Sequence, residues 1–112
     1  MNVKIVAGLL SVAALLVSPL ASAADAVKAE ALAKKEGCLK CHAVDKKKEA
    51  VSLKEVAKKY AGKADAEATI LHQITAGEKV KLEDGSEEEH KIIKTKDKAE
   101  ISNLIAWILS LK

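Results

Sequence analysis

The stretch that decides the fold is Cys-Leu-Lys-Cys-His, residues 38–42 of this 112-residue chain. Two thiols stand three positions apart, and an imidazole directly follows the second thiol. This C-x-x-C-H pattern is typical of covalent c-type haem attachment. One turn of backbone matches the distance between the two haem vinyl groups, so Cys38 and Cys41 are the predicted attachment residues. His42 is the predicted proximal ligand of the iron.

A C-x-x-C pair by itself also occurs in redox disulfides and in zinc sites. His72 and His90 could complete a four-ligand zinc set with the two cysteines, but the spacings match no common zinc motif. A thioredoxin-like site needs a surrounding βαβ pattern, which the sequence lacks. The histidine directly after the second cysteine therefore favours haem.

The first 23 residues have the three-part layout of a secretory signal peptide. Lys4 is the only early charge, residues 5–16 are almost entirely apolar, and Ala21-Ser22-Ala23 supplies small residues for cleavage, with one residue later as the alternative. The apolar run is shorter than the roughly 20 residues of a membrane span. We therefore expect residues 1–23 to be removed, leaving one domain at 24–112 in the bacterial periplasm with no stable membrane anchor.

The predicted mature domain is poor in aromatic residues and contains no arginine. Tyr60 and Trp107 are its only aromatics, so a bound haem would supply the large apolar body that a small core needs. All of its basic residues apart from histidine are lysines, whereas phosphate and nucleic-acid recognition commonly uses arginine. We expect no nucleic-acid partner.

Four stretches carry helix signals. Residues 25–36 are rich in alanine and stop at a glycine. Ser52, Asp65 and Asp97 each precede an apolar pattern of helical period and are the predicted N-caps of three further helices. The last helix has the strongest apolar stripe, formed by Ile101, Leu104, Ile105, Ile108 and Leu111. We expect the polar segment 78–96 to be a loop that crosses the far face of the haem.

In the order of these elements the chain resembles the small bacterial class I cytochromes c. The matching features are the motif at 38–42, residues 53–62, the stretch 74–77 and the ending Ala-Trp-Ile-Leu-Ser-Leu at 106–111. The resemblance implies an all-α fold of about four helices around one covalently bound haem c and its iron, with the first and last helices packed together. It also implies that the protein passes single electrons between redox partner proteins and is not itself an enzyme.

The chain departs from the family pattern at one position beside the motif. The family usually has a Gly-Pro pair there, and the proline carbonyl accepts a hydrogen bond from the proximal imidazole. Ala50 and Val51 stand at this place. The Val51 carbonyl remains available for the same bond, although the rigid proline turn is lost.

The second departure concerns the sixth ligand of the iron. The family usually supplies a methionine before the last helix, but residues 24–112 contain none. His90 lies in that region and is the predicted sixth ligand. An open or water-bound site, a nearby lysine such as Lys91 or Lys94, and His72 remain as alternatives, although helical phase turns His72 toward solvent.

The predicted ligand pair has a consequence for the reduction potential. Imidazole favours ferric iron more than thioether sulfur does, so a His42/His90 pair predicts a potential below that of the family's usual pair. Acidic side chains in the polar segment would lower it further if they lie near the haem. They are Glu83, Asp84, Glu87, Glu88 and Glu89.

Lysines cluster around the motif and suggest a positive rim that attracts an acidic docking surface on a redox partner. They are Lys34, Lys35, Lys40, Lys46, Lys47 and Lys48. A different function is also compatible with the sequence, namely binding or sensing of NO, CO or O₂ at an open or displaceable sixth site. A third is the electron-accepting subunit of a periplasmic oxidoreductase.

Overall fold

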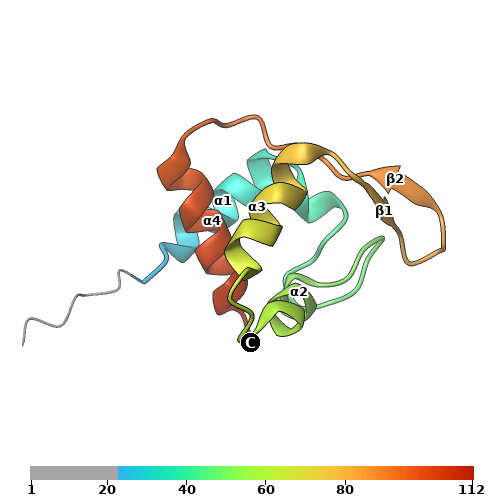
Figure 1. The fold of residues 1–112 in the computed structure, drawn as a ribbon, viewed down its shortest axis with the longest axis horizontal. Coiled ribbons are helices and arrows are strands. Elements are labelled where there is room, and N and C mark those ends of the chain that lie inside the picture. The colour runs from blue at the N-terminus through green and yellow to red at the C-terminus, as the bar shows by residue number, and fades with distance from the viewer. Residues whose placement is uncertain (1–22) are drawn as a thin grey trace, which may run out of the picture.

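Helix α4, Lys98–Ser110, is the centre of the fold, because it contacts each of the other three α-helices in the described region. The computed structural model describes residues 23–112, so all of the predicted signal peptide except Ala23 lies outside it. The elements in chain order are α1 (Ala26–Lys35), the 3-10 turn η1 (Cys38–Lys40), α2 (Leu53–Tyr60), α3 (Ala66–Ala76), β1 (Lys79–Lys81), β2 (Glu87–Glu89) and α4 (Figure 1). Within residues 23–112, no helix is both long and apolar enough to cross a bilayer. The predicted all-α class is confirmed.

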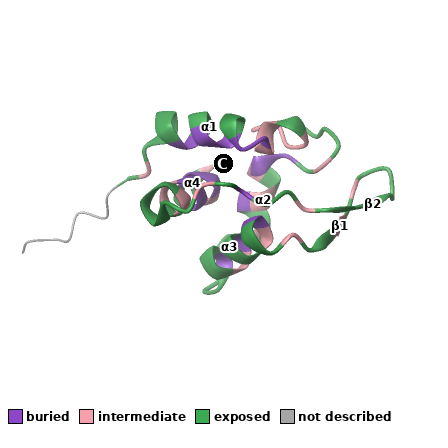
Figure 2. Ribbon diagram, turned by 90° about the horizontal axis from the view of Figure 1, so that it is seen from above, coloured by how far each residue is buried: buried purple, intermediate pink, exposed green. Residues whose placement is uncertain are grey.

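The first and last helices pack against each other, as expected (Figure 2). Leu32 and Ala33 of α1 and Leu104 and Ile105 of α4 belong to the same buried cluster, and Leu104 is fully buried. A polar bridge adds to this apolar contact. The Asn103 side chain accepts a 2.8 Å hydrogen bond from the backbone N–H of Asp25 and donates a 2.9 Å bond to its carbonyl. The two ends of the domain are therefore joined.

The predicted helix starts are confirmed, with one difference at α3. Ser52 Oγ accepts from the backbone N–H of Glu55 at 3.1 Å, and Asp97 caps α4 by accepting from Glu100 N at 3.1 Å. Asp65 occupies the N-cap position of α3 but makes no side-chain cap hydrogen bond. Its backbone (φ −96°, ψ 7°) is not extended as at the other two caps, so its carboxylate is not directed at the helix N–H groups.

The polar segment before α4 is not wholly a loop, because it contains the antiparallel hairpin β1–β2. Lys79 lies opposite Glu89, and Lys81 lies opposite Glu87. Gly85, with a φ of 87°, supports the turn between them. The strands are three residues long and almost entirely exposed, so they lack the apolar alternation that predicts a strand. The hairpin projects from the side of the molecule away from α1 and α4 (Figure 1).

Candidate haem site

The turn that follows α1 brings the three motif residues to one cavity. We call residues 37–42 the proximal turn. Gly37 ends α1 in the left-handed conformation (φ 81°), which an L side chain rarely adopts. The chain then makes one short turn, closed by a 3.0 Å hydrogen bond from His42 N to the Cys38 carbonyl. Cys38, Cys41 and His42 all line the same cavity.

The ring of His42 is oriented by the backbone beyond the motif. Its Nδ1 lies 2.6 Å from the Val51 carbonyl oxygen. Because a carbonyl only accepts, Nδ1 carries the proton and Nε2 keeps a free lone pair. The expected hydrogen bond from the proximal imidazole to the Val51 carbonyl is therefore present. Burial lowers the pKa of His42, with a further lowering by nearby His90 and an opposing effect of the Val51 bond, so the imidazole is neutral as a metal ligand requires.

Before any covalent attachment, the two cysteines are thiols that do not pair with each other. Burial raises the pKa of Cys38, and the negative charge of Glu36 adds to this effect. Burial also raises the pKa of Cys41, and its thiol donates to Glu49 Oε2 at 3.5 Å, which raises the pKa further. Both side chains are therefore protonated thiols at neutral pH, available to form thioether bonds.

His90 lies across the cavity from His42. Their ring centroids are 6.3 Å apart and their planes are tilted by 44°. The His90 Nδ1 donates to the Lys91 carbonyl at 3.0 Å, which leaves Nε2 free. A metal–imidazole bond is about 2.0 Å long and a ring nitrogen lies roughly 1.1 Å from its centroid, so two imidazoles on opposite sides of one metal have centroids about 6 Å apart. The observed spacing fits a single metal ion between the two rings.

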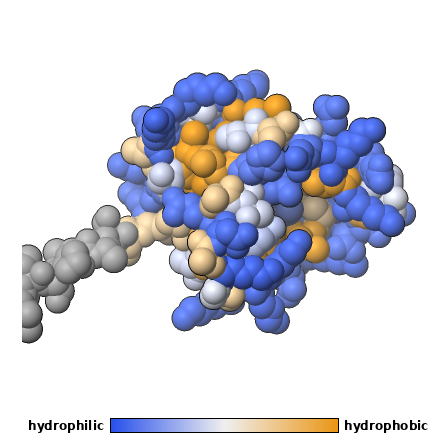
Figure 3. Space-filling model, in the orientation of Figure 1, coloured by the Kyte–Doolittle hydropathy of each residue, from blue (hydrophilic) through white to orange (hydrophobic). Residues whose placement is uncertain are grey.

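The space around these histidines is a cavity of about 850 Å³ with largely apolar walls. The apolar wall residues come from α2, α3, α4 and the loop before α4, and include Leu53, Val56, Ile70, Ile74, Ile93 and Ile108. Gln73 also lines the cavity, and its buried Oε1 has no hydrogen-bond partner within residues 23–112. Apolar surface shows in a recess beside the hairpin, framed by hydrophilic side chains (Figure 3). Two thiols, two imidazoles, apolar walls and an unpaired amide are a set that fits haem c.

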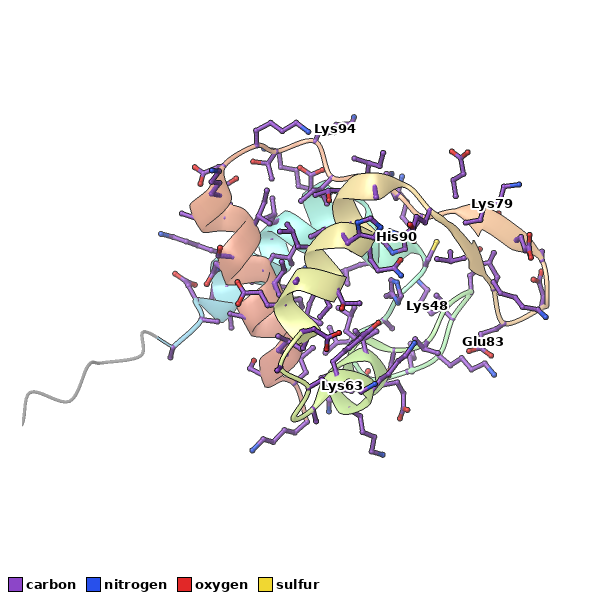
Figure 4. The ribbon with its side chains drawn as sticks, viewed as in Figure 1. Lys48, Lys63, Lys79, Glu83, His90 and Lys94 are labelled. Atoms are coloured by element: carbon purple, nitrogen blue, oxygen red, sulfur yellow. The ribbon has the colours of Figure 1, made fainter. Side chains whose placement is uncertain are left out.

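Of the other candidate ligands, Lys91 lines the cavity, whereas His72 and Lys94 do not. His72 is exposed on α3, and its Nε2 lies 2.8 Å from Glu78 Oε1. Lys91 extends over Gly37, with its Nζ 2.6 Å from the position that a Cβ would occupy there. Lys94 lies at the outer edge of the molecule, whereas His90 points inward (Figure 4). Among the described side chains, no group of three or more His, Cys, Asp or Glu residues could hold a bare metal ion, so the zinc set with His72 is not formed.

Three residues at the site carry no clear signal in the sequence. Gln73 sits among the apolar positions of α3, and Glu49 ends a run of charged residues, as a surface side chain would. Glu36 is the C-cap of α1, where the sequence suggests a solvent-exposed side chain, yet the residue is only 5% exposed. Its carboxylate accepts hydrogen bonds from the backbone N–H groups of Lys94 at 2.6 Å and Thr95 at 3.2 Å. Both amides belong to residues 90–95, which we call the distal segment.

The mouth of the cavity carries both signs of charge. Glu83, Glu88 and Glu89 of the hairpin region line the cavity, together with Lys40. Lys47 forms a 2.8 Å ion pair with Glu83, which joins the lysine run after the motif to the hairpin. Three of the five acidic residues of this run therefore line the same cavity as the motif residues.

The fold and the cavity define a class of protein: a small helical haem protein in which a C-x-x-C-H turn and a histidine-bearing segment face each other. The sequence profile of the cytochrome c family matches residues 26–112. This chain belongs to the cytochrome c family, as a small bacterial class I member.

Relatives and solved structures agree with this assignment. The chain is 40% identical to cytochrome c2 of Rhodocyclus tenuis over 83 residues, which are 73% of this chain and 90% of the relative. It is 45% identical to cytochrome c-551 of Pseudomonas aeruginosa over 58 residues, 52% of this chain and 56% of the relative. The crystal structure of class 1 cytochrome MtoD from Sideroxydans lithotrophicus ES-1 matches with a TM-score of 0.76 and 54% identity, covering 80% of this chain and 98% of that one. Cytochrome c552 of Nitrosomonas europaea matches with a TM-score of 0.60 and 32% identity, covering 74% and 99%.

Membership of the family fixes the cofactor and the coarse function. Haem c is attached covalently, and Cys38 and Cys41 fit the attachment motif. The protein is a monohaem electron carrier that acts with redox partner proteins. The family does not by itself identify the sixth ligand, because this chain lacks a methionine in the described region.

Proposed function

We propose that this protein is a periplasmic electron carrier in which Cys38 and Cys41 hold the haem and His42 and His90 are the axial ligands. The observation that supports this most directly is the 6.3 Å separation of the two ring centroids across the cavity. When bound, the haem supplies one-electron exchange between the ferric and ferrous states.

The protein contributes orientation and exclusion of water. The Val51 carbonyl fixes the tautomer and direction of His42. Ile74 and Ile93, which are 6% and 3% exposed, line the cavity from α3 and the distal segment. Buried apolar walls keep the surroundings of a carrier nearly unchanged as its charge changes, so little reorganisation accompanies each transfer.

We propose that the reduction potential lies below that of relatives with His/Met ligation. The second imidazole favours the ferric state. Glu83, Glu88 and Glu89 at the cavity mouth add negative charge, which also favours the more positive iron. The contribution of these exposed carboxylates falls with ionic strength, whereas that of the ligand does not.

The lysine group beside the motif is proposed to attract an acidic surface on the redox partner. Lys40 and Lys46 are exposed, and Lys47 is paired with Glu83. The rate of electron transfer to an acidic partner should therefore fall with added salt, and Lys40→Gln should lower it at low salt. A rate independent of salt would contradict this docking mode.

The periplasmic location rests on the predicted signal peptide at residues 1–23. We expect the mature protein recovered from the periplasmic fraction to begin at residue 24, or one residue later. Mass spectrometry of the intact haem protein checks this directly. A product that retains residues 1–23 and sediments with membranes would contradict it.

Absorption spectroscopy tests the proposed ligands. The oxidised and reduced protein should both show low-spin iron, and CO at the concentration that saturates reduced His90→Ala should not change the spectrum of the reduced parent. His90→Ala should convert the iron to high spin and admit CO, because it removes the sixth ligand. His72→Ala is the matched control, since His72 is exposed and paired with Glu78, and it should leave the spectrum unchanged.

Two outcomes would contradict the proposal. CO binding to the unmodified reduced protein with the same affinity as to His90→Ala would favour a protein that binds small ligands. An unchanged spectrum in His90→Ala would exclude His90 as the ligand.

A further inference from the structure

We propose that Glu36 is a positioning residue, which holds His90 over the cavity by binding the backbone of the distal segment. This inference rests on the proposed ligation by His90. Both oxygens of the Glu36 carboxylate accept backbone amides, so Glu36 acts through the chain that carries the ligand.

The contacts of Glu36 join two distant parts of the sequence. Its Oε2 accepts from Lys94 N at 2.6 Å and its Oε1 accepts from Thr95 N at 3.2 Å, across sequence separations of 58 and 59 residues. Each carboxylate oxygen thus serves one amide. Buried carboxylates are costly unless hydrogen-bonded, and hydrogen bonds to charged acceptors are among the stronger ones. The residue is therefore placed to fix this backbone.

The distal segment depends on few other anchors. It contains no helix or strand within the described residues. Its backbone is otherwise tied by His90 N to the Glu78 carbonyl at 2.8 Å and by Ile93 N to the Ile74 carbonyl at 3.0 Å. The first bond lies at the end of the segment that follows the hairpin, and the second lies in the middle of the segment. Glu36 supplies the anchor at the other end, just before α4.

The position of Glu36 in the chain gives this anchor its significance. Glu36 immediately precedes Gly37, where the proximal turn begins, and so stands two residues before Cys38. One side chain thus connects the turn that carries the proximal ligand to the segment that carries the distal one. Loss of the anchor should let His90 move away while the helices stay packed, because the α1–α4 contact is made by other residues such as Leu104.

Two variants of the holo-protein test this assignment. Glu36→Gln keeps the size of the side chain but replaces one acceptor oxygen with an NH2 group, which cannot accept. Glu36→Ala removes both acceptors. Glu30→Gln is the matched control, because Glu30 is an exposed glutamate of α1 that pairs with Lys34 alone among the described residues. It removes the same charge without touching the distal segment.

Two readouts separate positioning from general stability. The apparent CO affinity of the reduced protein scales with the fraction of molecules in which His90 has left the iron. It should rise about tenfold or more in Glu36→Gln and further in Glu36→Ala, with thermal unfolding still cooperative. Amide hydrogen exchange at Lys94 and Thr95 should quicken by about tenfold, while exchange in α4 stays slow. Glu30→Gln should change neither.

The outcomes distinguish this inference from the proposed ligation. If His90→Ala admits CO but both Glu36 variants keep the CO affinity and amide exchange of the parent, Glu36 does not position the ligand. If His90→Ala leaves CO binding and the spectrum unchanged, the ligation fails and this inference fails with it. Equal gains in CO affinity from Glu30→Gln and Glu36→Gln would assign the effect to charge alone and overturn the positioning role.

Discussion

The proximal turn and the distal segment face each other across one cavity, but they are held in different ways. The proximal side is fixed by bonds between residues close in sequence, such as His42 Nδ1 to Val51 O at a separation of 9. Ala50 N also bonds the Cys41 carbonyl, and Leu53 N bonds the Ala43 carbonyl. The distal side is fixed by long-range bonds, including those of Glu36 to residues 94 and 95.

This difference separates two kinds of dependence on the fold. The proximal turn can form from its own stretch of chain, because its bonds close only short loops. The distal segment needs α1, α3 and the hairpin to be in place before its anchors exist. Changes far from the iron should therefore affect the sixth ligand more readily than the fifth.

The largest expected effect comes from the proximal side. Replacing both Cys38 and Cys41 with Ala should abolish covalent haem attachment, because no thiol remains in the chain. Because no group then fills the 850 Å³ cavity, the domain should lose its cooperative unfolding transition. Haem staining after denaturing electrophoresis and circular dichroism measure the two effects. Stable, haem-stained protein from the double variant would contradict the assignment.

The distal side should tolerate exchange of its ligand without loss of the fold. His90→Met places a thioether opposite His42 and should raise the reduction potential, by on the order of 0.1 V. Thermal unfolding should remain cooperative, because His90 is not part of the buried core. Voltammetry gives the potential, and His72→Met is the control at an exposed position. A potential in His90→Met equal to or below that of the parent would count against ligation by His90.

Gly37→Ala should affect both sides at once. Its φ of 81° is unfavourable for alanine, at a cost of about 1–2 kcal/mol. The new Cβ would also meet the Lys91 ammonium, which lies next to His90 in sequence, and displace it.

Gly62→Ala separates these two effects. Gly62 has a similar φ of 73° but nothing within 4 Å of the Cβ position. Both variants should unfold at lower temperature by a similar amount, and only Gly37→Ala should also alter the haem spectrum. A shifted spectrum in Gly62→Ala would show that backbone strain alone accounts for the change.

The smallest expected effect lies at the tip of the hairpin. Hydrogen bonds from the Ser86 hydroxyl and N–H hold the pKa of Asp84 below its ordinary value. A lowered folded pKa stabilises the turn above the ordinary pKa of the carboxyl, and that contribution is lost as the pH falls through the lower, folded value. Ser86→Ala should return the pKa of Asp84 toward its ordinary value in an NMR titration, with no change in the visible spectrum. A pKa unmoved by this change would exclude the hydroxyl as the cause.

Local patterns made most of the fold predictable. Ser52 and Asp97 are caps whose bonds reach only a few residues along the chain, and the stripe of α4 repeats with helical period. The hairpin was missed because its strands are short and charged, and because their pairing depends on a turn rather than on apolar alternation. Asp65 occupies the predicted N-cap position but makes no side-chain cap hydrogen bond, because a suitable residue type does not guarantee a suitable backbone angle.

The residues of the candidate site also differ in how far the sequence predicts them. The attachment motif follows from its spacing, whereas the Val51 carbonyl and His90 followed from comparison with the family pattern; the role of His90 as a ligand stays a prediction. The role of Glu36 could not be recognised, because its partners are backbone amides nearly sixty residues away. No residue type in the sequence indicates that a backbone amide will be such a partner. Gln73 was hidden for a similar reason, since its surroundings depend on how three helices meet.

The hairpin also marks where this domain can change length. Val80 is its only partly buried strand residue, and both strands otherwise face solvent. Lengthening a surface loop costs little free energy, since closure entropy grows slowly with the number of residues. Insertions at Asp84-Gly85 should therefore be tolerated, and a peptide tag or a docking epitope could be grafted there, on the hairpin whose residues Val80, Glu88 and Glu89 line the cavity. The natural protein thus offers a site at which partner choice could diverge without any change to the helices.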